Sequence, residues 1–194
     1  MSDPSLIARS ALATSLAASR AEVTIEAAGD LAIAHIAARK GQSAALIERL
    51  ASSHGVAPPT TPKFTAGADL SFVWAGPEQW LAIAQHGNRR DLEAELAGQL
   101  KGFASVTDQS DARTFVRVSG PKSRATLAKG LPIDLHPRAF PAGAAAITHA
   151  AHIGVIVWRP DDSDTFMLGC ARSYSVSLWS WLMESAAEYG ASVY

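Results

Sequence analysis

Short apolar runs typical of buried strands alternate along this chain with apolar stripes typical of helices. Residues 31–38 are almost wholly apolar, which predicts a buried strand. The next segment opens at Gly41 and repeats apolar residues with helical spacing at Leu46, Ile47 and Leu50. We therefore expect a short helix that turns these three side chains inward.

A hairpin and a second helix follow a loop rich in Pro and Thr at residues 57–69. Residues 70–76 and 80–85 predict two strands joined by a tight turn. Residues 88–100 carry leucines on one stripe and glutamates on the other side, which predicts an amphipathic helix. Residues 103–106 then predict a return to strand.

The second half of the chain repeats this order. Residues 114–120 predict a strand. Pro121 is predicted at the first position of a helix that ends near Lys129, because its missing N–H removes no hydrogen bond there. The loop at residues 130–143 contains three prolines, so we expect it to run extended over the surface.

A second hairpin, a further strand and a final helix complete the pattern. Residues 144–150 and 152–159 predict the hairpin strands, and residues 165–170 predict the next strand after a turn rich in Asp and Ser. The final helix is predicted to begin near Ser173 and to bury one mainly apolar stripe. That stripe consists of Tyr174, Leu178, Trp181, Leu182, Ser185 and Tyr189.

Two successive units of strand, helix, Pro-rich loop, hairpin and helix indicate a structural duplication. Each unit has the order of a split βαβ motif. The predicted fold class is therefore α+β, with two tandem ferredoxin-like lobes, mostly antiparallel sheet and helices on one face of each sheet. We assign residues 1–21 to an N-terminal extension, 22–107 to the first lobe and 108–194 to the second, and expect one compact unit with a seam near residues 106–113.

Composition narrows the classes of function. Hydrophobic residues make up 48% of the chain and charged residues 18%, which favours a globular protein with apolar surface to cover by a partner. The formal net charge is −1 and no basic stripe is present, so we expect no nucleic-acid partner. The single cysteine, Cys170, permits no internal disulfide; we expect it to pack as a small hydrophobe in a cytoplasmic protein.

Several signals of membrane insertion, export and nucleotide chemistry are missing from the sequence. No run approaches the roughly 18 to 20 apolar residues of a membrane-spanning helix. Residues 1–20 lack the basic leader and apolar run of a secretory signal. They have some features of a transit peptide, and a frayed or partner-docked amphipathic helix is an equally good interpretation. The sequence also contains no GxG dinucleotide fingerprint, phosphate loop, GxSxG or HExxH motif.

Two pairs of polar residues suit a catalytic or metal site only weakly. His149 and His152 have the spacing of a metal pair, but no acidic residue or cysteine stands beside them, so we interpret them as ordinary turn residues and expect no metal. Asp108 and Asp111 have the composition of an acid/base couple. Solvated turn carboxylates or caps are the favoured interpretation of these two residues.

Better candidates for binding lie in the Pro-rich loop and around the final helix. Asp134 and His136 occupy the stiff loop at residues 130–143, where positioned polar groups often bind a ligand, although a hydrogen bond within the loop is the slightly favoured alternative. Arg172, with Ser173 as a possible N-cap, would offer its guanidinium to a carboxylate of another chain, of a ligand or of this chain. Trp179 lies off the buried stripe, so we expect it to be exposed at an interface.

The second half resembles the gamma subunit of heterotetrameric sarcosine oxidase. The resemblance is carried by VSGPKSRATLAKGLPIDLHP and ARSYSVSLWSWL, and more loosely by FVWAGPEQWLAIA in the first half. None of these segments is a catalytic signature. The family is related in fold to the folate-binding domain of glycine-cleavage aminomethyltransferases, which agrees with the predicted fold class.

The resemblance implies an accessory role in an oxidoreductase acting on CH–NH donors, within sarcosine catabolism and one-carbon metabolism. Such complexes demethylate sarcosine to glycine with hydrogen peroxide and, with tetrahydrofolate, a methylene-folate product. The implied partners are the alpha, beta and delta subunits. FAD, FMN, NAD and tetrahydrofolate are implied in those partners, with no cofactor bound by this chain alone and no activity of the isolated chain.

Three alternatives remain open at this point. A stand-alone folate-binding protein or aminomethyltransferase-like enzyme would use the seam between the lobes, with Arg113, Asp134 or Arg172 as polar anchors. A subunit of a related N-methyl amino acid oxidase or dehydrogenase would assemble in the same way. A regulatory or scaffold protein would share the fold without either function. As interface or ligand residues we therefore name Arg113, Asp134, His136, Arg172, Tyr174 and Trp179.

Overall fold

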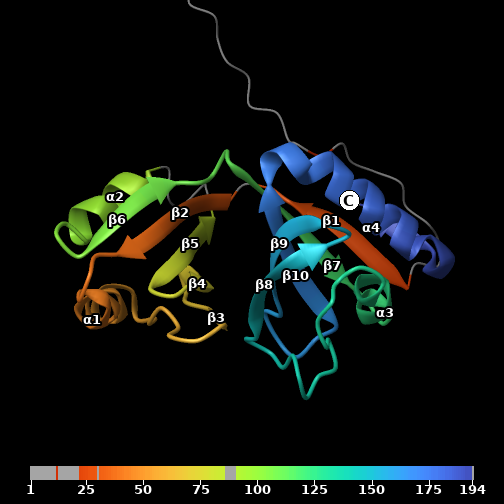
Figure 1. Cartoon of the computed structure of the whole chain (residues 1–194), viewed down its shortest axis with the longest axis horizontal. Coiled ribbons are helices and arrows are strands. Elements are labelled where there is room, and N and C mark those ends of the chain that lie inside the picture. Colours follow the sequence, from red (N-terminus) through yellow and green to blue (C-terminus); the bar gives the residue numbers. More distant parts are fainter. Residues whose placement is uncertain (1–11, 13–21, 30, 86–90, 194) are drawn as a thin grey trace, which may run out of the picture.

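Two mostly antiparallel sheets pack face to face, and helices cover the outer face of each sheet (Figure 1). The computed structural model describes residue 12 and residues 22–29, 31–85 and 91–193. The α+β class, the antiparallel pairing and the placement of helices on one face of each sheet are as the sequence predicts. Among the described residues, no helix combines the length and apolarity that crossing a bilayer requires.

The five-stranded sheet has the split βαβ order that the first half of the sequence predicts. The predicted strand at residues 31–38 is found with those bounds, and its neighbours come from the predicted hairpin and return strand. The second helix begins after Asp91, whose side chain caps it by accepting from Ala94 N at 3.1 Å; the earlier predicted start, residues 88–90, lies outside the described residues. The strand order is β3 (Phe64–Thr65), β4 (Ser71–Gly76), β5 (Gln79–Gln85), β2 (Leu31–Ala38) and β6 (Ala104–Asp108), covered by α1 (Ser43–His54) and α2 (Leu92–Gln99).

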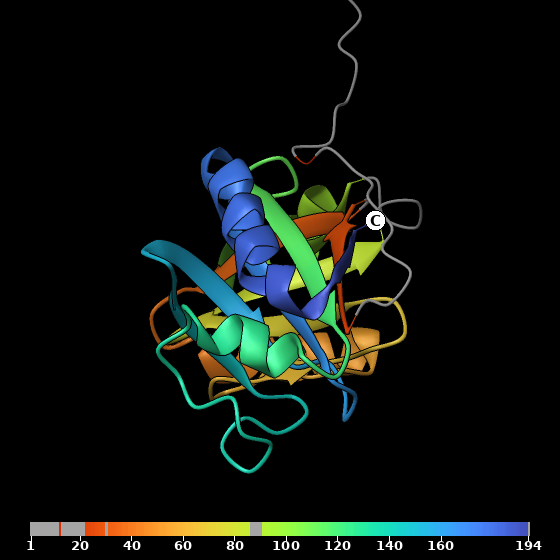
Figure 2. The same ribbon diagram turned by 90° about the vertical axis from the view of Figure 1, so that its right-hand side faces the viewer.

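The six-stranded sheet is built mainly from the second half of the chain. Helices α3 (Ser123–Ala128) and α4 (Ser175–Ala186) lie in front of this sheet in Figure 2. Leu12, the described residue of the N-terminal extension, is buried in the core beneath these helices. The strand order is β11 (Ala191–Val193), β1 (Val23–Ala28), β7 (Arg113–Ser119), β10 (Thr165–Ala171), β9 (Ile153–Trp158) and β8 (Ala145–Ala150).

Strand β1 joins the sheet of the other half. Although the sequence-based division places residues 22–107 in the first lobe, β1 pairs antiparallel with β7 and parallel with β11. It holds the position beside β7 that β6 holds beside β2. The chain therefore crosses between the sheets twice, after β1 and after β6. The second crossing is tied to β2, because Gln109 N donates to Ile33 O at 2.8 Å and Ile33 N donates to Ser110 Oγ at 3.0 Å.

A third core fills the space between the two sheets. Phe115 meets Trp158 edge-on, with ring centroids 5.5 Å apart, and Phe64 stacks on Trp158 at 5.9 Å. Aromatic pairs at these distances add to the stability that their buried area provides. The two lobes are thus held together by an apolar layer, formed by Ile33, Val73, Leu81, Phe115, Ala145, Ile156 and Trp158.

The starts of two helices differ from the prediction. Residues Arg172–Tyr174 form a 3-10 turn, η2, so α4 begins at Ser175 and Ser173 is not its N-cap. The tighter turn shifts the phase of the stripe, which leaves Tyr174 54% exposed while Leu178 and Leu182 are buried as predicted. Pro121 lies in a turn before α3, which begins at Ser123.

Candidate functional site

The backbone segments that carry three of the candidate residues lie at one end of the six-stranded sheet. Arg113 begins β7 and pairs in register with Ala171, the last residue of β10. The N–H of Arg172 donates to the carbonyl of Ala112 at 2.9 Å, which fixes the start of η2 beside the start of β7. Tyr174 ends η2 with its side chain exposed. The sequence separates these residues, and the pairing of β7 with β10 brings them together.

An apolar stripe continues from this end along the flank of α4. Val176 is 67% exposed, and Trp179 and Met183 follow at helical spacing. Trp179 was expected to be exposed, but it is partly buried and packs against the core beneath α4. Exposed and half-exposed apolar side chains at this spacing are typical of a helix that contacts a second protein.

Arg113 is a half-buried cation whose Nε has no hydrogen-bond partner in the described structure. No ion pair joins its guanidinium to a described carboxylate. Burial lowers the pKa of Arg113, but a guanidinium stays charged throughout the physiological range. The unpaired Nε carries a desolvation cost in the fold.

His35 lies near Arg113 and was not selected by the sequence analysis. Its Nε2 lies 3.1 Å from Gln79 Oε1, across the pairing of β2 with β5. Burial lowers the pKa of His35, and the charge of Arg113 lowers it further, while the Gln79 contact acts in the opposite sense. A histidine inside an otherwise apolar strand was the available signal for this polar position in the sequence.

Cys170 also lies near Arg113 and belongs to the core. Its thiol is buried and free, and it packs in the cluster beneath α3 and α4 as the sequence predicts. Burial raises the pKa of the thiol, and the Arg113 charge only partly offsets this effect. A thiol in this environment is a poor nucleophile.

Asp134 and His136 lie at the opposite end of the same sheet. Asp134 Oδ1 accepts from His136 N at 2.8 Å, and His136 Nδ1 accepts from Arg138 N at 3.2 Å. These bonds within the loop are the alternative that the sequence analysis favoured for both residues. Asp134 Oδ1 and His136 Nδ1 therefore form hydrogen bonds that stabilise the loop.

The Pro-rich loop is anchored at the start of β10. Arg124 donates through Nε to Leu135 O at 3.1 Å and through Nη1 to Asp164 Oδ1 at 2.6 Å. Because Arg113 pairs with the far end of β10, the strand length of about 20 Å separates the loop from Arg113. The structure does not bring Asp134 and His136 together with the other candidates.

The two remaining polar pairs make local contacts within the chain. Asp108 Oδ1 accepts from Ser110 N at 3.0 Å and from Ser110 Oγ at 2.6 Å, which stabilises the crossing between the sheets. The rings of His149 and His152 stack with centroids 6.4 Å apart. Within the described part of the chain, no group of three or more His, Cys, Asp or Glu side chains is placed to hold a metal ion.

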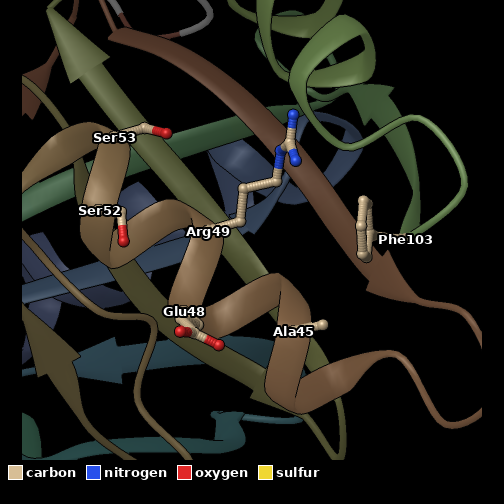
Figure 3. Close-up of a pocket in the computed structure, with 6 residues that line it drawn as sticks. All are labelled: Ala45, Glu48, Arg49, Ser52, Ser53 and Phe103. Carbon is tan, nitrogen blue, oxygen red and sulfur yellow. The ribbon is translucent and has the colours of Figure 1, made fainter.

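A surface hollow of about 400 Å³ lies on the other half of the molecule (Figure 3). Arg49 extends from α1 over the ring of Phe103, with its Cζ 5.4 Å from the ring centroid. The hollow is open, and the candidates from the sequence do not line it. Its walls are Ala45, Glu48, Arg49, Ser52, Ser53 and Phe103.

The first similarity is one of fold, to an aminomethyltransferase. The structure is similar to the glycine cleavage system aminomethyltransferase T from Bartonella henselae, with a TM-score of 0.62 and 15% identity over 84% of this chain and 46% of that chain. This likeness shows the fold alone. It agrees with two ferredoxin-like lobes packed through their sheets.

The family follows from closer similarities. The model of the sarcosine oxidase, gamma subunit family matches residues 20–188. Sarcosine oxidase subunits gamma from Corynebacterium sp. (strain P-1) and Arthrobacter sp. are each 34% identical over 143 residues, which is 72% of this chain and 69% of those proteins. The chain belongs to the sarcosine oxidase gamma subunit family, which confirms the resemblance seen in the sequence.

A solved structure extends the similarity to three dimensions. A chain of the heterotetrameric sarcosine oxidase from Corynebacterium sp. U-96, in complex with pyrrole 2-carboxylate, matches with a TM-score of 0.77 and 27% identity. The match covers 90% of this chain and 88% of that chain. The whole fold of this chain, rather than one lobe of it, is therefore shared with a component of that assembly.

Proposed function

We propose that this chain is the gamma subunit of a heterotetrameric sarcosine oxidase, assembled with alpha, beta and delta subunits. The observation that carries the proposal is the match over 90% of the chain to one chain of such an assembly. The proposed complex demethylates sarcosine to glycine, producing hydrogen peroxide and methylene-tetrahydrofolate. The partner subunits hold FAD, FMN, NAD and tetrahydrofolate, and this chain contributes mainly structure.

The polar chemistry of the described residues supports an accessory role. Asp134, His136 and Asp108 direct their polar atoms to their own loops. The Cys170 thiol is buried with a raised pKa. Arg172 and Tyr174 are exposed, and Trp179 on the flank of α4 is partly exposed. Arginine, tyrosine and tryptophan are the residue types that contribute most to protein interfaces. We propose that these residues contact a larger subunit.

Purification of the tagged chain from its native cell tests this function. The expected result is a set of larger subunits with a flavin absorbance spectrum and sarcosine-dependent peroxide production. A colourless chain that purifies without partners would contradict the proposal and would favour a stand-alone folate-binding protein. A yellow complex that oxidises another N-methyl amine but not sarcosine would place the chain in a related oxidase.

A further inference from the structure

We infer that the outer edge of β8 receives an extended segment of a partner subunit, which adds a strand to the six-stranded sheet beside Ile147 and His149. The inference rests on the proposed function, because it names one contact within that assembly. It commits to main-chain pairing as the mode of recognition, with an apolar side chain of the partner over Ile147.

The first argument is the direction of the backbone groups along β8. This strand is the last of its sheet, and among the described strands it pairs with β9 alone. Ala145 N donates to Pro62 O at 3.1 Å, on the side away from β9. In an antiparallel ladder, successive residues turn their N–H and C=O groups to opposite sides. The backbone groups of Ile147 and His149 therefore point outward, as those of Ala145 do.

The second argument is that an extended segment of this chain already covers the start of the same edge. Lys63, just before β3, forms an antiparallel bridge with Ala144, so β3 and β8 lie side by side (Figure 1). The chain before Lys63 then leaves the edge, since Pro59 O accepts from Trp80 Nε1 on β5 at 2.7 Å. In the described part of the chain, no backbone hydrogen bond continues this pairing past Ala145. An extended segment is thus the kind of occupant that fits the open remainder.

The third argument is the apolar side chain at the open part of the edge. Ile147 is 54% exposed. Its register partner Ile156, and Ala145 on the same face of β8, both belong to the apolar layer between the two sheets. That layer therefore ends at an isoleucine that faces solvent. A partner strand with an apolar residue opposite Ile147 would extend the layer, because apolar cross-strand pairs stabilise a sheet.

The other described edge strands are protected against pairing in ways that β8 is not. Strand β3 has two residues and follows Pro62 and Lys63, and β11 has three residues. Strand β6 ends in the carboxylate of Asp108. Short length, proline and charge are the usual protections of a sheet edge. Strand β8 has six residues without proline, lysine, arginine or a carboxylate, so its open part is suited to pairing.

Hydrogen exchange of wild type, alone and in the purified complex, tests the inference at single amides by fragment mass spectrometry. The outward amides of Ile147 and His149 should exchange freely in the isolated chain. In the complex they should exchange at least about 100-fold more slowly, because exchange then requires the added strand to open. The amides of Ala146 and Thr148 face β9, and as internal controls they should be slow in both states.

Three substitutions at residue 147 separate the backbone contribution from that of the side chain. Proline is tolerated where a strand N–H faces solvent, so Ile147→Pro should fold, but it removes the donor and its ring obstructs a partner strand. The dissociation constant of its complex should rise at least about 10-fold. Ile147→Thr keeps the N–H and the branched shape and should weaken the complex less. Ile147→Val keeps the N–H and an apolar side chain, and as the matched control it should bind within about twofold of wild type.

Each contrary outcome has one meaning. If wild type assembles with no partner subunits, the proposed function fails before the edge of β8 is reached. If the complex forms and the Ile147 and His149 amides exchange as fast as in the isolated chain, the inference is wrong while the proposed function stands. If both amides are already slow in the isolated chain, the edge is occupied by the chain itself or by a second copy, and the inference is also overturned. These exchange rates of wild type decide the matter even if Ile147→Pro does not fold.

Discussion

Gly169 shows how closely single residues are fitted between the two sheets. A Cβ at this position in β10 would lie 2.2 Å from Phe115 Cε1 and 3.0 Å from Ile156 Cγ2. The Phe115 ring is held by its edge-on contact with Trp158, so it cannot move aside without loss of that contact. The absence of a side chain at residue 169 is therefore a requirement of the layer between the sheets.

Gly169→Ala should lower the free energy of unfolding by about 1–3 kcal/mol, the usual cost of overpacking a filled core. Chemical denaturation of the isolated chain measures the change. Gly154→Ala is the matched control, because Gly154 lies in the adjacent strand with nothing within 4 Å of a Cβ. The control should be neutral or slightly stabilising. Equal effects of the two substitutions would contradict the packing described between the sheets.

His35 should give the stability of the chain a dependence on pH. Its pKa in the folded protein lies below the ordinary value of 6.5, mainly because of burial. The unfolded chain therefore binds the proton more readily, and stability falls as the pH drops below 6.5 towards the folded pKa. The lowered pKa values of Asp161 and Glu188 act only below their ordinary values of 3.8 and 4.5.

His35→Gln removes the titrating group while retaining a side chain able to bond with Gln79. Denaturation at a series of pH values should show wild type losing stability as the pH falls below 6.5, and the variant losing less. Parallel profiles for the two proteins would show that His35 is not the residue responsible.

At the scale of elements, the end of α4 is held by the residue that follows α3. Lys129 Nζ donates to the carbonyl of Ser185 at 2.5 Å and also pairs with Glu188. The same ammonium lies 4.8 Å from the centroid of the Tyr189 ring. A cation at the C-terminal end of a helix is favoured by the helix dipole. Lys129 thus connects α3 to the segment that leads into β11.

Lys129→Met should loosen this segment without unfolding the protein. Amide hydrogen exchange at residues 187–192 should become roughly fivefold faster, the effect of losing a hydrogen bond of about 1 kcal/mol. Lys122→Met is the control, since Lys122 lies 5.8 Å from the same ring and leaves the Ser185 bond in place. Faster exchange in the control but not in Lys129→Met would contradict this assignment.

Two elements show where the sequence sufficed and where it did not. Strand β2 was predicted with its observed bounds, because a long apolar run leaves little alternative to a buried strand. The stripe of α4 was predicted with one wrong member, Tyr174, because nothing local distinguishes a 3-10 turn from the first turn of an α-helix. Because Tyr174 was assigned to the buried stripe, the sequence pattern did not show that its side chain is exposed at this end of the sheet.

At the scale of the whole molecule, the sequence pattern could not predict which sheet β1 joins. The segment at residues 23–28 alternates only briefly, and its choice between two sheets depends on contacts made about ninety residues later, at β7. Arg113 was selected from the sequence as a polar anchor. Its unpaired Nε, and the position of its backbone beside Ala171, could be seen only in the three-dimensional structure.

Because β1 belongs to the sheet of the second half, we predict that the two halves of the sequence are not independent folding units. A fragment of residues 108–194 lacks the strand between β7 and β11, which leaves β7 unpaired on one side and β11 without a partner strand. Alone it should show no cooperative thermal transition, and addition of the 1–107 fragment should restore one. A cooperative transition of the 108–194 fragment alone would show that β1 is dispensable to its sheet.

Native mass spectrometry of the assembly purified through this chain tests the central claim most directly. The account predicts one copy of this chain in a particle with three partner chains that differ from it in mass. A particle that contains only this chain, as a monomer or as copies of itself, would contradict the claim that it acts as a subunit of an oxidase.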